Sequence, residues 1–295
     1  MRICDNIVSN TTFDFFQKTL VEVIIKMSRE NNNKKDNRRI IYYRDELNDE
    51  FSTAEIEAKK IDGSWKYIRN PILCFFWYRI VATPIAFFYT KFKYKHKIVG
   101  KEKLKGFKNE GYFVYGNHTQ ILGDPLIPSF VVFPKAAHII VHPNNVSMPY
   151  LGRVTPYMGG LPLPDDMAAT RNFSAAIEQR ISEKRAVFIY PEAHIWPYYT
   201  KIRPFGDASF SYPIKHKTPV FCFTNTYQKK GKSEHPQIVT YVDGPFYPDE
   251  FLPMRERRKR LRDEVYFAMR QRAKLSNAEW IKYIPMSEEN ATEEQ

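Results

Sequence analysis

The stretch YFVYGNHTQILGDP, residues 112–125, decides the fold that this sequence predicts. It opens with a hydrophobic run, YFVYG (112–116), which is typical of a buried strand, and then enters a polar turn. Further apolar runs follow it along the chain: AAHIIVH (136–142), AVFIY (186–190) and PVFCFT (219–224). Residues 165–184 lie between two of these runs and carry the acidic cap and apolar stripe of a helix. Strands alternating with helices predict an α/β domain, a mixed sheet flanked by helices, over residues 98–252.

The segment before this domain, 71–90, is the most apolar in the chain and reads PILCFFWYRIVATPIAFFYT. A helix of that length would reach about 30 Å, enough to cross a bilayer. Arg79 near its middle, Pro84 and lysines on both flanks argue against a simple span. We therefore expect a helix-break-helix element over 71–97 that docks in one leaflet, with its lysines on anionic head groups. A buried pair of core helices is the alternative.

The ends of the chain differ in composition from its middle. We expect the first 70 residues to hold an amphipathic helix around Phe16 and Ile24, a charged linker over 28–39 and one short helix within 40–62. The segment 253–295 begins as a basic helix and ends as an acidic tail. The apolar face of that helix carries Leu261, Val265 and Met269.

Composition limits the partners and the compartment. The net charge of +12 favours anionic partners such as anionic lipid, nucleic acid or phosphorylated ligands. No nucleic-acid-binding motif is found, so a membrane surface or an acidic partner is expected instead. The three cysteines form no CxxC pair, which predicts neither a disulfide framework nor a zinc cluster and suits a reducing cytoplasm. The start, MRICDNIVSN, lacks the pattern of a signal peptide.

His118 and Asp124 are the residues with the clearest chemical signature. His118 follows the end of the strand 112–116, where ligands and catalytic groups of open α/β sheets gather. An imidazole can take a proton from an attacking hydroxyl near neutral pH, and a carboxylate on its other nitrogen fixes its tautomer. No GxSxG motif is present, and none is needed if the acceptor hydroxyl attacks directly. Taken alone, the pair is also compatible with a structural histidine.

Two further sites follow along the chain. Glu192 comes directly after the strand 186–190, where its carboxylate could hold the hydroxyls of an acceptor or lie exposed on a loop. Gly159 and Gly160 allow the backbone to approach a ligand closely, or they make a simple turn. His138 and His142 are four residues apart, but the strand pattern around them separates them by about 13 Å, so no metal site is expected.

These sites together, in this order, resemble the lysophospholipid acyltransferase family, which includes 1-acylglycerol-3-phosphate acyltransferases. The family's Asn-His motif is similar to Asn117-His118, its glycine turn falls on 159–164, and its Pro-Glu and Pro-Phe steps fall on 191–192 and 204–205. The resemblance covers roughly residues 75–245. It implies a general base at His118, oriented by Asp124, and a substrate site that includes Asn117, Glu192 and the two glycines. It also implies an acyl-CoA or acyl-carrier-protein co-substrate, with no other cofactor and no metal, at the cytoplasmic face of a membrane.

The sequence departs from the family pattern in ways that concern the acceptor. Five residues rather than four separate His118 from Asp124, and Gly123 is expected to absorb the extra one as a bulge. Pro164 stands where the family has an arginine. Arg203 is the candidate replacement that would bind an acceptor phosphate, the alternative being a solvated surface charge. Transfer of an acyl chain to a hydroxyl of a lysophospholipid or lipid-like acceptor is expected. An acceptor without phosphate, or a degenerate member that only binds lipid, remains as the alternative.

Overall fold

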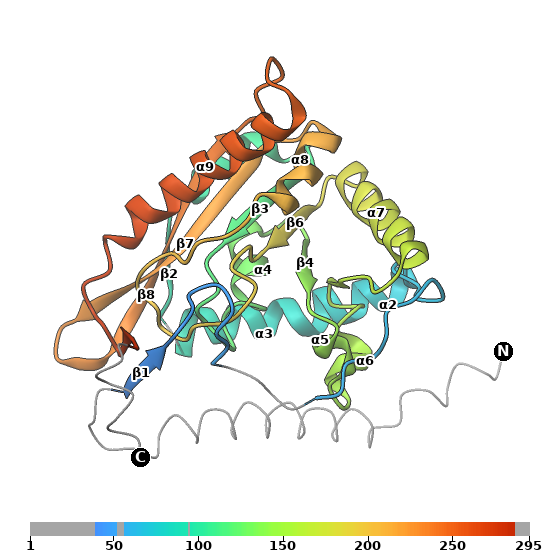
Figure 1. The fold of residues 1–295 in the computed structure, drawn as a ribbon. Helices are drawn as coiled ribbons and strands as arrows, with labels where there is room; N and C mark the ends of the chain where they lie inside the picture. Colours follow the sequence, from blue (N-terminus) through green and yellow to red (C-terminus); the bar gives the residue numbers. More distant parts are fainter. Residues whose placement is uncertain (1–38, 52–55, 94, 287–295) are drawn as a thin grey trace, which may run out of the picture.

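A computed structural model describes residues 39–51, 56–93 and 95–286 of this chain (Figure 1). At its centre lies a seven-stranded sheet in the order β2-β8-β7-β3-β6-β4-β5. The strands are β2 (Lys97–Val99), β3 (Tyr112–Gly116), β4 (Ala137–Val141), β5 (Gly160–Pro162), β6 (Ala186–Ile189), β7 (Val220–Lys230) and β8 (Ser233–Phe246). Strands β3 to β7 run parallel, whereas β8 is antiparallel to β7 and parallel to β2. The prediction of a mixed α/β sheet is confirmed.

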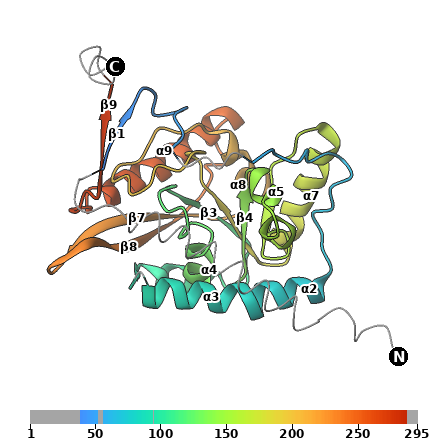
Figure 2. The same ribbon diagram turned by 90° about the horizontal axis from the view of Figure 1, so that it is seen from below.

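Helices cover both faces of this sheet (Figure 2). One face packs against α7 (Met167–Ser182), α8 (Ser211–His216) and α9 (Met254–Ala273). The other packs against α4 (Ile127–Val132) and the 3-10 helix η3 (Lys101–Phe107). Short elements complete the domain: α5 (Asn144–Ser147), α6 (Leu151–Val154) and the 3-10 helix η4 (Ala208–Phe210). Almost every residue of β3 and β6 is buried, as expected for strands covered on both sides.

In two helices, the structure contains the contacts that the sequence pattern predicts. Asp166 caps α7 by accepting a hydrogen bond from Ala169 N at 2.7 Å, as its position predicted. The predicted apolar face of α9, with Leu261, Val265 and Met269, is fully buried in the core. Burying each such side chain contributes about 1.5–3 kcal/mol to the free energy of folding. Helix α9 therefore belongs to the same core as the sheet.

The apolar segment forms one unbroken helical run. It consists of α2 (Pro71–Phe75), the π-helical η1 (Phe76–Ala82), α3 (Thr83–Phe88) and the π-helical η2 (Tyr89–Lys93). The break expected at Pro84 is absent, so that prediction was wrong. Pro84 lies in the first turn of α3, directly after a widened π turn, and the Thr83 hydroxyl donates to Tyr78 O at 2.7 Å. The helix continues through Pro84 because the widened π turn tolerates the loss of the N–H donor that proline lacks.

Much of this helix faces outward. Phe75 and Phe88 are 62% and 67% exposed, and Pro71–Phe92 is long and apolar enough to cross a membrane by length and composition. This exposure disfavours the alternative of a buried core helix.

A second, two-stranded parallel sheet joins the ends of the described chain. It pairs β1 (Arg39–Tyr43) with β9 (Ile281–Pro285). β-branched and aromatic side chains make β1 a strand. The described residues of 40–62 form no helix, and residues 52–55 lie outside the described part of the chain. Trp196 stacks on Tyr283 at 5.0 Å and packs against Tyr43 at 4.9 Å. The two-stranded sheet thus fixes the loop that follows β6. The helix expected around residues 16–24, most of the linker and the acidic tail lie outside the described residues.

Candidate active site

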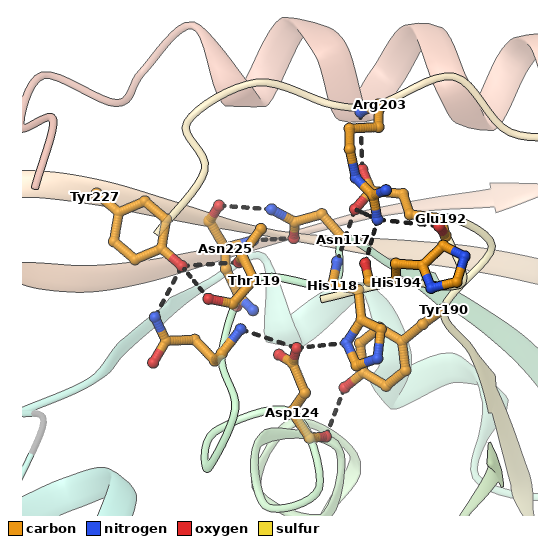
Figure 3. A network of polar contacts seen from close by, with 11 residues as sticks. Asn117, His118, Thr119, Asp124, Tyr190, Glu192, His194, Arg203, Asn225 and Tyr227 are labelled. Carbon is orange, nitrogen blue, oxygen red and sulfur yellow. Dashed lines mark hydrogen bonds and ion pairs between the residues drawn. The ribbon is translucent and has the colours of Figure 1, made fainter. Parts of the chain in front are cut away.

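His118 and Asp124 form a hydrogen-bonded pair at the carboxyl end of β3 (Figure 3). His118 Nδ1 and Asp124 Oδ2 are 2.7 Å apart. The His118 side chain is 17% exposed and that of Asp124 only 1%. The same carboxylate oxygen also accepts a hydrogen bond from Gln120 N at 2.9 Å. A carboxylate held in this way makes Nδ1 the protonated nitrogen of a neutral imidazole and leaves Nε2 free to accept a proton.

The extra residue between His118 and Asp124 is absorbed by a helical turn. Asp124 N donates to Gln120 O at 2.9 Å, and Ile127 N donates to Gly123 O at 2.7 Å. A Cβ atom on Gly123 would lie 2.8 Å from Cβ of Gln120, so the turn can close this tightly only at a glycine. The expected bulge is therefore a helical turn, and it brings Asp124 to the imidazole despite the longer spacing.

Burial dominates the electrostatics of Asp124. It raises the pKa of the Asp124 carboxyl, while the hydrogen bond and charge of His118 and the main-chain N–H of Gln120 act in the opposite direction. A carboxylate with so little access to water interacts strongly with a neighbouring positive charge. An imidazolium formed at His118 during a reaction would be stabilised by this carboxylate.

Tyr190 supports the pair and was not singled out from the sequence. Its ring stacks on the imidazole of His118, with centroids 4.4 Å apart and planes at 18°. Its hydroxyl donates to the main-chain oxygen of Asp124 at 2.5 Å. One side chain therefore contacts both members of the pair. The only sequence signal was its place as the last residue of the run 186–190, one strand away from β3.

Glu192 binds main chain within the protein. Its Oε2 accepts a hydrogen bond from His118 N at 2.9 Å, and its Oε1 accepts one from Arg203 N at 3.0 Å. The residue is 3% exposed. The expectation that its carboxylate holds an acceptor does not fit this burial. Glu192 instead fixes the backbone of His118.

Arg203 is fully buried, which corrects its expected role as a phosphate ligand. Its guanidinium donates to the carbonyl oxygens of Glu192 at 3.0 Å, Glu46 at 3.1 Å and His194. It also lies 3.8 Å from the Glu192 carboxylate and stacks 4.9 Å from the Trp196 ring centroid. The alternative of a solvated surface charge is equally wrong. The aromatic sheet β1–β9 covers this loop, a contact between chain ends that the local sequence could not reveal.

The residues on either side of His118 are tied to β7. Asn117 Nδ2 donates to Asn225 O at 3.0 Å, and Asn225 N donates to Asn117 Oδ1 at 2.8 Å. Thr119 Oγ1 accepts a hydrogen bond from the Tyr227 hydroxyl at 2.7 Å. All four side chains are buried. Asn117, expected to bind substrate, thus extends the pairing of β3 with β7 and holds the loop of His118.

The paired glycines lie far from this site. Gly160 pairs with Ile139, which is level with Phe188 of β6 and Val114 of β3. His118 is four residues further along, so the separation is about 13 Å along the strands and about 14 Å across them. Gly159 has φ +99°, and a Cβ there would lie 2.6 Å from Ala137 O. The close approach that requires Gly159 is to β4, and its expected role in substrate binding does not fit.

Metal ligands are not clustered in the described part of the chain. No group of three His, Cys, Asp or Glu side chains there could hold a metal ion. His138 lies on β4, in agreement with the strand expected from its sequence.

Comparison with known proteins gives a weak likeness to solved structures. No protein-family profile matches the chain, and no curated protein matches it. Among solved structures, it is similar to the 1-acyl-sn-glycerophosphate (LPA) acyltransferase PlsC from Thermotoga maritima. The identity is 18%, the TM-score is 0.45, and the match covers 61% of this chain and 72% of that chain. A likeness at this level assigns no function, so the function must be argued from the site itself.

Proposed function

We propose that this protein transfers a fatty acyl chain from a thioester, acyl-CoA or acyl-carrier protein, to a hydroxyl of a lipid-like acceptor. The observation that carries the proposal is the His118–Asp124 pair, 2.7 Å apart at a strand end, with the histidine accessible and the aspartate buried. The sequence motifs that resemble lysophospholipid acyltransferases supply the reaction class. The intact pair disfavours a degenerate lipid-binding protein, because its main support was the altered spacing.

The proposed step needs only these two side chains as acid–base groups. His118 Nε2 takes the proton of the acceptor hydroxyl as its oxygen attacks the thioester carbonyl. Asp124 stabilises the imidazolium that results. The C–S bond then breaks, and the proton passes from His118 to the departing thiolate. The products are an ester and a free thiol. Acyl-transfer assays over a panel of phosphorylated and neutral acceptors test this proposal.

We expect the substitution Asp124→Asn to lower kcat at least about tenfold. An asparagine amide can donate to Nδ1, which would favour the tautomer with the proton on Nε2 and block its function as a base. The measurement is steady-state acyl transfer, with circular dichroism as the folding control. Activity within twofold of wild type would mean that another group orients His118.

A neutral alcohol is a second candidate acceptor, and the burial of Arg203 favours it. Its guanidinium is engaged by carbonyl oxygens and by Glu192, so it cannot also bind a phosphate in this conformation. Pro164 stands where the family would supply another arginine. In the acceptor panel, a higher kcat/KM for a neutral lipid alcohol than for a lysophospholipid would select this candidate.

We also propose that the helix Pro71–Phe92 docks the protein in one leaflet at the cytoplasmic face of a membrane. Apolar side chains line its exposed face, and Lys91 and Lys97 lie at one end of the helix. The apolar face would give a salt-resistant contribution, whereas the lysines would give one that salt screens over about 8 Å. Part of the binding should therefore survive high salt.

We expect Phe88→Ser to weaken vesicle binding at least about tenfold, because burying a phenylalanine is worth about 1.5–3 kcal/mol. The matched control is Phe267→Ser, since Phe267 on α9 is exposed to nearly the same extent, 65% against 67%. Vesicle sedimentation at low and high salt measures both. Equal losses in the two variants would contradict docking through this helix.

A further inference from the structure

Three arginines meet where the C-terminal end of α7 approaches the start of α2. They are Arg69, which precedes α2, and Arg180 and Arg185, which flank the end of α7. Arg180 Nη1 lies 3.0 Å from Glu183 Oε2, and Arg185 Nε lies 3.7 Å from the same oxygen. Figure 2 shows the chain that leads into α2 running alongside α7. Arg69, Arg180 and Glu183 all act electrostatically on Cys74 of α2. Arg185 joins this corner through its ion pair with Glu183.

These guanidinium groups leave hydrogen-bonding capacity unused. The Nε atom of each arginine is buried without a hydrogen-bond partner among the described residues. The guanidinium of Arg69 instead stacks 4.9 Å from the Trp65 ring and 5.8 Å from that of Tyr157. Each guanidinium carries five N–H donors in a fork that matches a phosphate or carboxylate. Buried donors of this kind are normally paired, and an anion with acceptor oxygens would pair them.

One carboxylate, Glu183, pairs with Arg180 and Arg185. Burial alone would raise the pKa of Glu183, but hydrogen bonds from Gln179 and Arg180 and the charges of Arg180 and Arg185 lower it below its usual range. Burial, reinforced by the charges of Arg180 and Arg185, lowers the pKa of His138 to about 3, so this neighbour is neutral. The corner therefore carries an excess of positive charge in partly desolvated surroundings, where an anion is attracted most strongly.

The apolar side chains next to this corner suggest where the anion comes from. Ile72, Phe75 and Phe76 of the outward-facing helix are 76%, 62% and 39% exposed and follow Arg69 within seven residues. We propose that Arg69, Arg180 and Arg185 bind the phosphate of an anionic lipid head group whose acyl chains lie along these side chains. Basic pockets beside membrane helices bind head groups in this way.

This site is separate from the proposed catalytic one. Tyr89, at the far end of the helix, comes fifteen positions after Cys74 at the corner, a distance of about 22 Å at 1.5 Å per residue. Tyr89, at this far end, acts electrostatically on Tyr198. The main-chain N–H of Tyr198 donates to the carbonyl oxygen of Thr119, the residue next to His118. A lipid bound at the corner would thus anchor one end of the helix while the reaction takes place near the other.

The test compares vesicle binding of the full chain. The vesicles are phosphatidylcholine alone, phosphatidylcholine with phosphatidylglycerol, and phosphatidylcholine with oleate at matched surface charge. Wild type should bind the phosphatidylglycerol vesicles about tenfold more tightly than the oleate vesicles, because bidentate arginine contacts favour phosphate. Arg69→Gln and Arg185→Gln should each remove that preference. Arg185→Lys, which keeps the charge but not the fork, should remove it as well.

The matched control is Arg171→Gln, an exposed arginine on α7 outside the corner. It should change binding to both anionic vesicles by less than about twofold, as expected for one exposed charge. The site would be overturned if Arg171→Gln weakened vesicle binding as much as the corner variants do. It would also be overturned if wild type bound both anionic vesicles equally, since general surface charge would then explain the binding. Displacement by inorganic phosphate, but not by chloride at equal ionic strength, would assign the corner to free phosphate instead. Since the assay requires no acyl transfer, its failure would leave the catalytic proposal untouched.

Discussion

Replacing His118 with alanine is expected to reduce acyl transfer by about 10²–10⁴-fold, the usual contribution of a general base. The imidazole is the one group in the His118–Asp124 pair with an accessible edge, so no other side chain of the pair could take the proton from the acceptor. The loss should appear in kcat, whereas KM for the thioester should change little, because the ring is not needed to bind the acyl chain.

Folding must be preserved for this result to count. The backbone of His118 is held through its N–H by Glu192 and through its oxygen by Trp196 N, and alanine keeps both contacts. The matched control is His142→Ala, an exposed histidine outside the site, which should retain wild-type activity. A His118→Ala protein that melts like wild type and still transfers acyl groups would disprove the mechanism.

Replacing Arg203 with alanine is expected to lower the free energy of unfolding by about 3–5 kcal/mol, the cost of leaving one charge of a buried pair unpaired. Both side chains of the Arg203–Glu192 pair are completely buried. The Glu192 carboxylate would keep only its main-chain donors, His118 N and Arg203 N. Denaturant unfolding measures the effect, and activity should fall together with stability because Glu192 fixes His118.

Two further variants test whether the loss of stability comes from the unpaired charge of Glu192. Lys201→Ala, an exposed change two residues away, should lie within about 0.5 kcal/mol of wild type. Adding Glu192→Gln to Arg203→Ala should recover part of the stability by removing the orphaned charge. If Arg203→Ala is as stable as wild type but has a raised KM only for phosphorylated acceptors, Arg203 is a phosphate ligand after all.

The sheet and the His118–Asp124 pair could be predicted because their signals are local. The runs 112–116 and 186–190 are short, apolar and bounded by turn residues, and they became β3 and β6. His118 follows the first run directly, so its place at a strand end needed no tertiary information. Pairing of β1 with β9 joins residues more than 200 positions apart, and no local pattern encodes such a contact.

The roles expected for Arg203, Glu192 and the paired glycines were misjudged for the same physical reason. Whether Arg203 is exposed depends on the aromatic cover that Trp196 makes with Tyr43 and Tyr283, far away in sequence. The distance of Gly160 from His118 depends on the order and register of four strands. Motif order along a chain constrains neither burial nor lateral strand position. The contact of Tyr190 with His118 was not predicted, because a tyrosine at the end of a strand is common.

The account is tested most directly by measuring thiol release and ester formation together, in wild type given an acyl-CoA with and without a lipid alcohol. Direct attack by the acceptor predicts thiol release that depends on the acceptor and equals the ester formed. Its rate should rise with acceptor concentration and fall to background in His118→Ala. Thiol release at the same rate without acceptor, with no ester formed, or release that persists in His118→Ala, would contradict acyl transfer by this histidine.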